Sequence, residues 1–365
     1  MAESVLITGG AGFIGSHLAD ELLAAGCAVR ALDSLVAQVH GDGERPGYLN
    51  GDVELITGDI RHADVVRGAL EGIDSVVHLA ARVGVAQSMY EPAEYAAANT
   101  AGTAVLLEAL LDHPVRKLVV ASSMSIYGEG AYVPAPATER TREQLERGDW
   151  DPRGANGEQL EPVPTPESKE PALASVYALT KYDQERMCLL YGSAYDVPAV
   201  ALRFFNVYGP HQALSNPYTG VLAIFASRLL NNHSPVVYED GGQRRDFVHV
   251  ADVARACRLA LEQGGADGQA VNVGSGQSAS VLEIAETLAR LLGKEIEPEV
   301  PGKFRAGDIR HCFADVTRAR EALGFEAEVP FEQGLAELAE WLEGQAATDR
   351  FDEAAAELTQ RGLTR

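Results

Sequence analysis

Thr8-Gly9-Gly10-Ala11-Gly12-Phe13-Ile14-Gly15 joins a short apolar run, Val5–Thr8, to a segment with helical spacing of apolar residues, Phe13–Ala25. A diphosphate can rest on the exposed N–H groups at a helix start only where no Cβ blocks its approach, so this junction requires glycine. The next predicted strand, Val29–Leu32, is followed by Asp33, whose carboxylate would accept hydrogen bonds from ribose hydroxyls and repel a 2′-phosphate. This order predicts a βαβ unit that binds NAD rather than NADP.

Two further junctions lie at the same predicted edge of the sheet. Gly58-Asp59-Ile60 follows the third predicted strand and can place Asp59 near the adenine, while Leu79-Ala80-Ala81 follows the fourth and passes small residues beside the cofactor. The residues expected to contact the cofactor here are Gly9, Gly12, Phe13, Ile14, Gly15, Asp33, Asp59, Ile60, Leu79, Ala80 and Ala81.

The alternation of strands and helices continues along the chain. Short apolar runs between polar or glycine-containing turns predict strands, and longer segments with helical periodicity predict helices. The predicted strands are Val5–Thr8, Val29–Leu32, Val53–Ile56, Ser75–Leu79, Lys117–Ala121 and Ala199–Phe204. The predicted helices are Phe13–Ala25, Ala63–Leu70, Glu94–Leu111, Tyr177–Tyr195, Val221–Leu230, Ala251–Gln263, Val281–Leu292 and Phe331–Leu342. This pattern is typical of an α/β fold with a doubly wound parallel sheet.

Composition excludes several classes of partner. The 365 residues include 30 Lys and Arg against 53 Asp and Glu, a formal net charge of −23, which disfavours duplex nucleic acid and anionic membranes. The four cysteines lie far apart without a C-x-x-C pair, so we expect neither a disulfide framework nor a metal site. No apolar run approaches the roughly 20 residues that cross a bilayer, and no basic leader precedes the first strand. We therefore expect a cytoplasmic protein.

Two segments carry side chains suited to oxidising an alcohol. Tyr177-Ala178-Leu179-Thr180-Lys181 places a phenol and an ammonium on one face of a predicted helix, and Ser123 follows a predicted buried strand at the ligand-binding edge of the sheet. An alcohol gives up hydride easily only when its proton also leaves, and a free tyrosine with a pKa near 10 is a poor base at neutral pH. Lowering that pKa by about 3 takes roughly 4 kcal/mol, which we expect Lys181 and a positively charged nicotinamide to supply. Ser123 would hydrogen-bond the same substrate oxygen.

Several motifs occur together in an order that resembles one protein family. They are T-G-G-A-G-F-I-G, H-L-A-A, S-S-M-S-I-Y-G, Y-A-L-T-K, R-F-F-N-V-Y-G-P, R-R-D-F-V-H-V-A-D-V and R-A-G-D. Over about residues 4–345 the chain is similar to the extended short-chain dehydrogenases/reductases of the nucleotide-sugar epimerase/dehydratase group. The resemblance implies a Rossmann domain for NAD, a smaller C-terminal α/β domain for a nucleoside diphosphate sugar, and an active site between them.

The resemblance also implies roles for individual residues. Ser123, Tyr177 and Lys181 correspond to the catalytic triad, and Asn99, Tyr177 and Lys181 join the cofactor contacts. The residues implied at the diphosphate or the nucleotide are Asn206, Arg245, Arg305 and Asp308. Arginine suits this task because its planar guanidinium holds phosphate through two hydrogen bonds. For Arg244 and Arg310 we expect surface ion pairs instead. A homodimer through the helices Glu94–Leu111 and Tyr177–Tyr195 is implied as well.

The expected domains are interleaved along the chain. Residues 1–205 plus 247–275 are expected to bind NAD, 206–246 plus 276–345 to bind the nucleotide sugar, and 346–365 to form a solvated terminal helix or a frayed end. Residues 132–171, rich in proline and charge, predict a long surface insertion, either a lid or an excursion without a role. Trp150 is the residue in its middle with enough apolar area to anchor it.

The residues after Ser123 bear on the choice of reaction. The dehydratases of this group have an Asp-Glu pair there, whereas this chain has Met124 and Ser125, neither of which shuttles protons near neutral pH. We therefore expect a 4-epimerase, which oxidises C4 to a 4-keto sugar, lets the sugar turn over and returns the hydride to the opposite face. The residues expected at the sugar are Val83, Gly84, Ser88, Ser123, Met124 and Ser125.

The substrate and the alternatives rest on resemblance. The run Ala81–Tyr90, with S-S-M-S-I-Y-G-E-G and the insertion, is most similar to dTDP-L-rhamnose 4-epimerases. A UDP-glucose/galactose-type 4-epimerase is the nearest competitor, and a decarboxylase of uronic acid sugars would begin with the same C4 oxidation. A regulatory protein that senses NAD without catalysis is a further alternative, although such proteins commonly lose the tyrosine or lysine present here.

Overall fold

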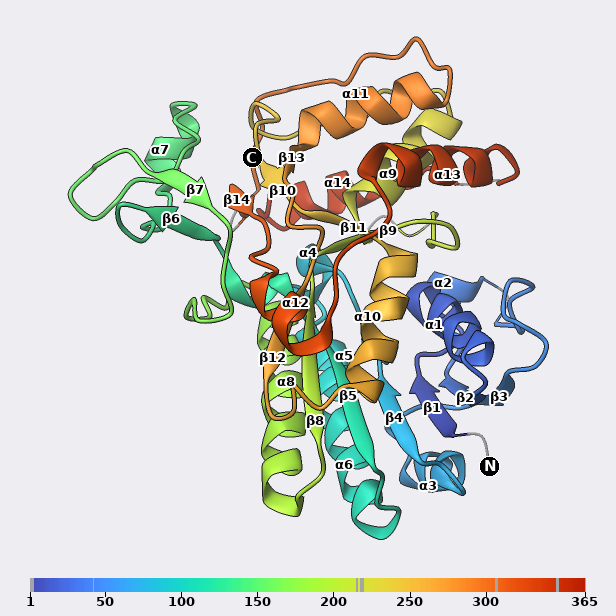
Figure 1. Cartoon of the computed structure of the whole chain (residues 1–365). Helices are drawn as coiled ribbons and strands as arrows, with labels where there is room; N and C mark the ends of the chain where they lie inside the picture. Colours follow the sequence, from blue (N-terminus) through green and yellow to red (C-terminus); the bar gives the residue numbers. More distant parts are fainter. Residues whose placement is uncertain are drawn as a thin grey trace.

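The computed structural model describes residues 3–41, 43–214, 216, 220–305, 308–345 and 348–364. A seven-stranded sheet with the order β12-β8-β5-β4-β1-β2-β3 forms its centre (Figure 1). Every pairing in this sheet is parallel, so the predicted doubly wound α/β fold is confirmed. The strands are β1 (Ser4–Thr8), β2 (Ala28–Asp33), β3 (Glu54–Thr57), β4 (Ser75–His78), β5 (Lys117–Ser123), β8 (Ala199–Phe204) and β12 (Ala270–Val273).

Helices cover both faces of the sheet because its strands are apolar on both sides. In β1, Val5 and Ile7 join a core on one face, and Leu6 joins a second core on the other. The first core is closed by α1 (Phe13–Ala24), α10 (Val250–Glu262) and α12 (Thr317–Leu323). The second is closed by α3 (Ala63–Leu70), α6 (Gly102–Asp112) and α8 (Val176–Tyr195).

Two elements of the sheet domain differ from the prediction. Strand β12 was not predicted, because Asn272 interrupts its apolar run; the Asn272 side chain is fully buried and hydrogen-bonds Tyr127 and the Thr165 carbonyl. The predicted helix Glu94–Leu111 consists of α5 (Pro92–Tyr95), a π-helical segment η1 (Ala96–Ala101) and α6.

A second lobe lies above the sheet in Figure 1 and has its own apolar core. Its helices α9 (Val221–Leu230), α11 (Val281–Leu291) and α13 (Phe331–Glu343) each turn an apolar face to that core. Two small sheets join it to the rest of the chain. They are formed by β9 (Asn206–Tyr208) with β11 (Phe247–His249), and by β10 (Arg244–Arg245) between β13 (Ala279–Ser280) and β14 (His311–Cys312).

The end of the chain differs from the expectation of a solvated or frayed tail. Residues Phe351–Gln360 form helix α14, which buries Phe351, Ala354 and Leu358 on one face. Their spacing of three and four residues is the apolar period of a packed helix. The segment is short and rich in acidic residues, so this period does not stand out in the sequence.

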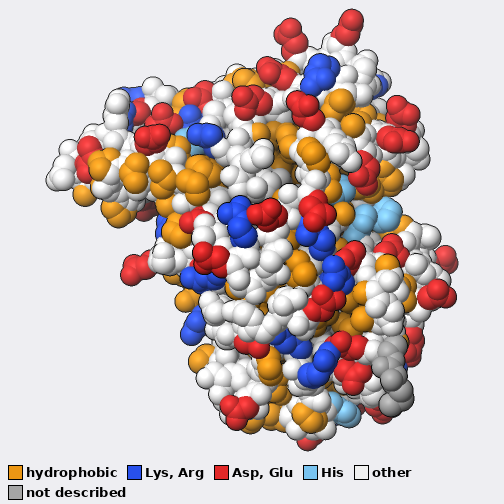
Figure 2. All heavy atoms as spheres, viewed as in Figure 1, with side chains coloured by type: hydrophobic (Ala, Val, Ile, Leu, Met, Phe, Trp, Pro, Cys, Tyr) orange, Lys and Arg blue, Asp and Glu red, His pale blue; other side chains and the backbone are white. Residues whose placement is uncertain are grey.

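The insertion forms the arm that projects on the left of Figure 1. Strands β6 (Ala131–Val133) and β7 (Glu161–Val163) pair antiparallel, and the short helix α7 (Arg142–Glu146) lies between them in sequence. Figure 2 shows acidic side chains over the upper lobe, around α11 and α13. Within the described residues, no helix is long and apolar enough to cross a membrane.

Candidate active site

A cavity of about 1080 Å³ lies at the carboxyl edge of the central sheet, between the sheet and the second lobe. Most of the residues predicted for the site line it together, although they come from distant parts of the sequence. They are Gly9, Gly12, Phe13, Ile14, Gly15, Asp33, Asp59, Ile60, Leu79, Ala80, Ala81, Val83, Gly84, Ser123, Met124, Ser125, Tyr177, Lys181, Asn206, Arg245, Arg305 and Asp308. The two residues between Arg305 and Asp308 lie outside the described residues.

Two predicted contacts lie behind the cavity wall instead. Asn99, in η1, is fully buried; its Oδ1 accepts a hydrogen bond from Arg82 N at 2.7 Å, and its Nδ2 donates to Thr180 Oγ1 at 3.0 Å. Ser88, at the end of α4 (Val85–Ser88), accepts a hydrogen bond on Oγ from Tyr177 N at 3.0 Å. Both residues therefore hold the wall to α8 rather than line the cavity.

The glycine turn after β1 is shaped for close approach. A Cβ on Gly15 would lie 2.4 Å from the Gly9 carbonyl oxygen, and Gly9 itself has a φ of +72°. Asp33 at the end of β2 is nine-tenths buried, and its carboxylate accepts hydrogen bonds from Ala11 N and Leu35 N, each at 3.0 Å. An open helix start beside a fixed carboxylate fits the diphosphate and adenosine ribose of NAD.

Tyr177 and Lys181 lie on α8, and Ser123 ends β5, so three separate side chains meet at one wall of the cavity. Burial raises the pKa of Tyr177, and a hydrogen bond with Ser123 opposes this increase. Burial also lowers the pKa of Lys181 to about 7. In the protein alone, burial therefore disfavours the charge of both side chains, and the lowering of the tyrosine pKa by Lys181 together with a positively charged nicotinamide stays a prediction.

Lys181 has a partner that the motif did not indicate. Its Nζ donates to Gln184 Oε1 at 2.7 Å, and Gln184 Nε2 donates to Thr103 Oγ1 at 2.9 Å and lies 3.0 Å from His78 Nε2. Burial lowers the pKa of His78 to about 3, so this ring is neutral at physiological pH. The only sequence signal for Gln184 is its position one helical turn after Lys181.

The other end of the cavity carries polar atoms available to a ligand. Among the described residues, Asn206 Oδ1, Gln212 Oε1 and Arg305 Nε are buried without a hydrogen-bond partner. The Arg305 guanidinium lies 4.2 Å from the centre of the Tyr238 ring. Arg245 donates to the carbonyls of Arg310, at 3.0 Å, and of Ile309. The guanidinium groups of Arg305 and Arg245 suit a diphosphate, whereas the two amide oxygens accept hydrogen bonds and suit a hydroxyl or N–H group of a ligand.

Two neighbouring arginines were expected in surface ion pairs. Arg310 is 4% exposed and its ion pair with Glu239 is buried, so that expectation is wrong for it. Arg244 is exposed, with its guanidinium 5.3 Å from the centre of the Phe313 ring.

The C-terminal segment also lines this end of the cavity, which the sequence did not indicate. Phe351, Ala354 and Leu358 of α14 and the following Leu363 contribute to its wall. Thr364 forms a backbone bridge with Arg305, so this wall touches a predicted nucleotide contact directly.

Comparison with known proteins gives one family and several relatives. The model of the NAD-dependent epimerase/dehydratase family matches residues 5–274. A dTDP-L-rhamnose 4-epimerase from Burkholderia thailandensis is 36% identical over 355 residues, covering 93% of this chain and 95% of the relative. A UDP-N-acetyl-α-D-glucosaminuronate decarboxylase from Bacillus cytotoxicus is 30% identical, covering 93% and 98%. The crystal structure of a Thermus thermophilus UDP-glucose 4-epimerase in complex with NAD is similar with a TM-score of 0.75 and 32% identity, covering 94% and 100%.

Proposed function

The chain belongs to the NAD-dependent epimerase/dehydratase family, and from this premise we propose that it is a nucleotide-sugar 4-epimerase whose substrate is dTDP-L-rhamnose, inverted at C4. One observation carries the proposed chemistry: Tyr177, Ser123 and Lys181 line the same cavity as the glycine turn and Asp33. A base for an alcohol proton is thereby placed in one cavity with a site for a hydride acceptor.

The proposed roles follow from the chemistry of each side chain. The glycine turn and Asp33 would hold NAD, which when bound would supply the acceptance and return of the C4 hydride. Tyr177 takes the proton of the C4 hydroxyl on its phenolate oxygen and gives it back on the return step. Ser123 hydrogen-bonds the same oxygen and favours the ionised tyrosine. Asn206, Arg245 and Arg305 hold the diphosphate while the 4-keto sugar turns over.

The residues around Ser123 support epimerisation over elimination of water. Met124 and Ser125 line the cavity, and the Ser123 hydroxyl donates to Ser125 Oγ at 3.0 Å. Elimination of water needs one group that acts as an acid and one that acts as a base. Neither Met124 nor Ser125 can take either part near neutral pH. Decarboxylation of a uronic acid sugar needs only the C4 oxidation, so it is the second candidate, favoured by the 30% identical decarboxylase relative.

The substrate is tested directly by NMR. Purified protein without added cofactor is incubated separately with dTDP-L-rhamnose, UDP-glucose and a UDP-linked uronic acid, and the sugar C4 proton is followed. We expect the C4 epimer of dTDP-L-rhamnose, and no conversion by Tyr177→Phe. Conversion of UDP-glucose alone would assign the nearest competitor, and loss of the carboxylate would assign the decarboxylase. No turnover by folded protein containing NAD would contradict the catalytic proposal itself.

A further inference from the structure

The insertion is anchored on the second lobe through the buried guanidinium of Arg140. This side chain is only 5% exposed although it lies in a surface segment rich in proline and charge. Its Nη1 donates to Glu239 Oε1 at 2.7 Å, and its Nη2 donates to the Asp308 carbonyl at 2.7 Å. Within the insertion, the Trp150 carbonyl accepts a hydrogen bond from the same Nη1 at 3.0 Å. Arg140 therefore joins the insertion to two separate segments of the lobe.

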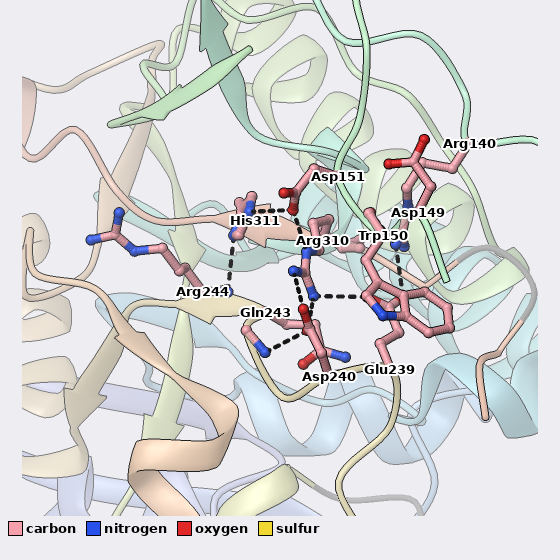
Figure 3. Close-up of polar contacts among 12 residues, drawn as sticks. Arg140, Asp149, Trp150, Asp151, Glu239, Asp240, Gln243, Arg244, Arg310 and His311 are labelled. Carbon is pink, nitrogen blue, oxygen red and sulfur yellow. Dashed lines mark hydrogen bonds and ion pairs between the residues drawn. The ribbon is translucent and has the colours of Figure 1, made fainter. Parts of the chain in front are cut away.

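A second arginine, from the lobe, reinforces this junction. Figure 3 shows Asp151, Glu239 and Asp240 grouped around Arg310. Arg310 Nε donates to Asp151 Oδ1 of the insertion at 2.9 Å, and its Nη1 donates to Glu239 Oε2 at 3.1 Å and to Asp240 Oδ1 at 2.6 Å. The Glu239 carboxylate, 1% exposed, thus lies between two guanidinium groups.

The backbone at Glu239 is constrained for this arrangement. Its φ is +55°, in the left-handed region that non-glycine residues rarely occupy. Such a conformation persists only where the surroundings hold it: here Glu239 N donates to the Lys303 carbonyl at 2.7 Å, and the two arginines hold the carboxylate.

Of the two segments held in this way, one carries the expected phosphate contact Asp308 and the other packs against the expected contact Arg305. Tyr238, next to Glu239, packs its ring against Arg305. The carbonyls of Ile309 and Arg310, next to Asp308, accept hydrogen bonds from Arg245, which also pairs with Asp308 at 3.6 Å. Asp308 and Ile309 line the cavity, whereas Arg140 and Glu239 do not, and the segment of Glu239 is linked to the cavity through the contact of Tyr238 with Arg305.

We propose that Arg140 is a positioning residue of the nucleotide site, which fixes Arg245, Arg305 and Asp308 by holding the Glu239 carboxylate and the Asp308 carbonyl from outside the cavity. The inference rests on the proposed function, because it takes these three residues as contacts of the diphosphate. It assigns the insertion a role in substrate binding that is neither that of a moving lid nor that of an excursion.

The test compares diphosphate binding with catalysis in the full-length protein. Calorimetry measures the Kd of dTDP, with UDP in parallel, and steady-state kinetics measures kcat and KM for the sugar that turns over. For Arg140→Ala we expect both the Kd and the KM to rise about ten-fold, which is about 1.4 kcal/mol, because the displaced phosphate contacts lose roughly one hydrogen bond to the charged diphosphate. We expect kcat and bound NAD to stay at the wild-type level. Arg140→Lys keeps the charge without the two-pronged contact, so it should show a smaller loss in the same direction.

Arg142→Ala is the matched control. This arginine lies in α7 of the same insertion, is 60% exposed and pairs only with Glu146 among the described residues, so its Kd should equal that of the wild type. If wild-type protein binds neither nucleotide, the proposed function fails. If the wild type binds dTDP and both Arg140 variants bind it as tightly, this inference alone fails. It also fails if both variants lose NAD and kcat together with a lower Tm, since that result indicates a general structural role.

Discussion

Tyr177 is proposed as a base although its surroundings in the protein disfavour the phenolate. Burial raises its pKa, and the Ser123 hydrogen bond is the contact that acts in the opposite direction. Because the rate should rise with pH as the phenol ionises, removing that bond moves the rise to higher pH. We therefore expect Ser123→Ala to lower kcat roughly 100-fold at neutral pH and to recover partly in alkaline buffer. A pH profile of kcat checks this; an unshifted profile would assign Ser123 to substrate orientation only.

Lys181 illustrates a cost in stability at a functional residue. Burial lowers its pKa from the ordinary value of 10.5 to about 7, so between about pH 7 and 10.5 the unfolded chain binds more protons than the folded protein. The free energy of unfolding therefore rises with pH through this window. Below about pH 7 Lys181 is charged in both states, and the full cost of burying its charge is present. Lys181→Met removes the buried charge and should stabilise the protein by about 1–3 kcal/mol at pH 6.5 while abolishing turnover.

Denaturant unfolding at pH 6.5 and pH 10 measures this effect of Lys181→Met. The gain in stability should be larger at the lower pH and should largely vanish at the higher one. Lys294→Met is the control, because the Lys294 ammonium makes an exposed hydrogen bond to Asn232. Equal gains at both pH values would show that packing of the methionine, rather than the charge, is responsible.

At the level of helices and strands, local signals were sufficient for the sheet and the glycine turn. The turn could be predicted because its requirement is local: a Cβ at Gly15 has no room beside Gly9. Strand β12 could not, because Asn272 is a buried polar residue whose partners Tyr127, Thr165 and Asp315 all lie far away in sequence. The π-helical segment η1 was likewise hidden, since its composition suits an ordinary helix.

The same distinction separates the predicted site residues from the missed ones. Motifs identified the side chains that line the cavity, since their chemistry requires particular residue types. Asn99 and Ser88 carry polar groups that look equally suited to a ligand. Only the fold shows that these groups hydrogen-bond α8 behind the cavity wall. Gln184 contacts Lys181 within one helix, where its position a turn later is the only signal, and Arg140 acts through contacts with residues far away in sequence, for which a single sequence offers no pattern.

Helix α14 gives a prediction for the nucleotide end of the cavity. Leu358 is buried and lines the wall, whereas the adjacent Thr359 is exposed. Leu358→Ala removes packing worth about 2–3 kcal/mol between this helix and the lobe, which should loosen the wall without disturbing the glycine turn. We expect a several-fold higher KM for the nucleotide sugar with unchanged bound NAD, and wild-type values for Thr359→Ala. An unchanged KM in Leu358→Ala would mean that α14 does not contribute to binding.

For the whole molecule, we expect a homodimer formed through α8 and its neighbour α6. Leu179 and Leu190, eleven residues apart, lie three turns apart on α8 and are 46% and 59% exposed in the single chain. Exposed leucines on one helix face favour a partner surface. Leu190→Glu should give a monomer in sedimentation velocity, because a carboxylate would be buried without a partner. Val300→Glu, at an exposed apolar residue of the other lobe, should leave the dimer intact; a monomeric wild type would contradict the expectation.

The bridge between Thr364 and Arg305 has a practical consequence for handling the protein. Any affinity tag or fluorescent fusion joined after this point would start beside the nucleotide end of the cavity and could compete with the substrate for space. Strand β1 instead begins at Ser4 on the opposite edge of the sheet, at the lower right of Figure 1. Fusions for binding assays and immobilisation therefore belong on the N-terminal side, and a C-terminal tag should be removed before affinities are compared.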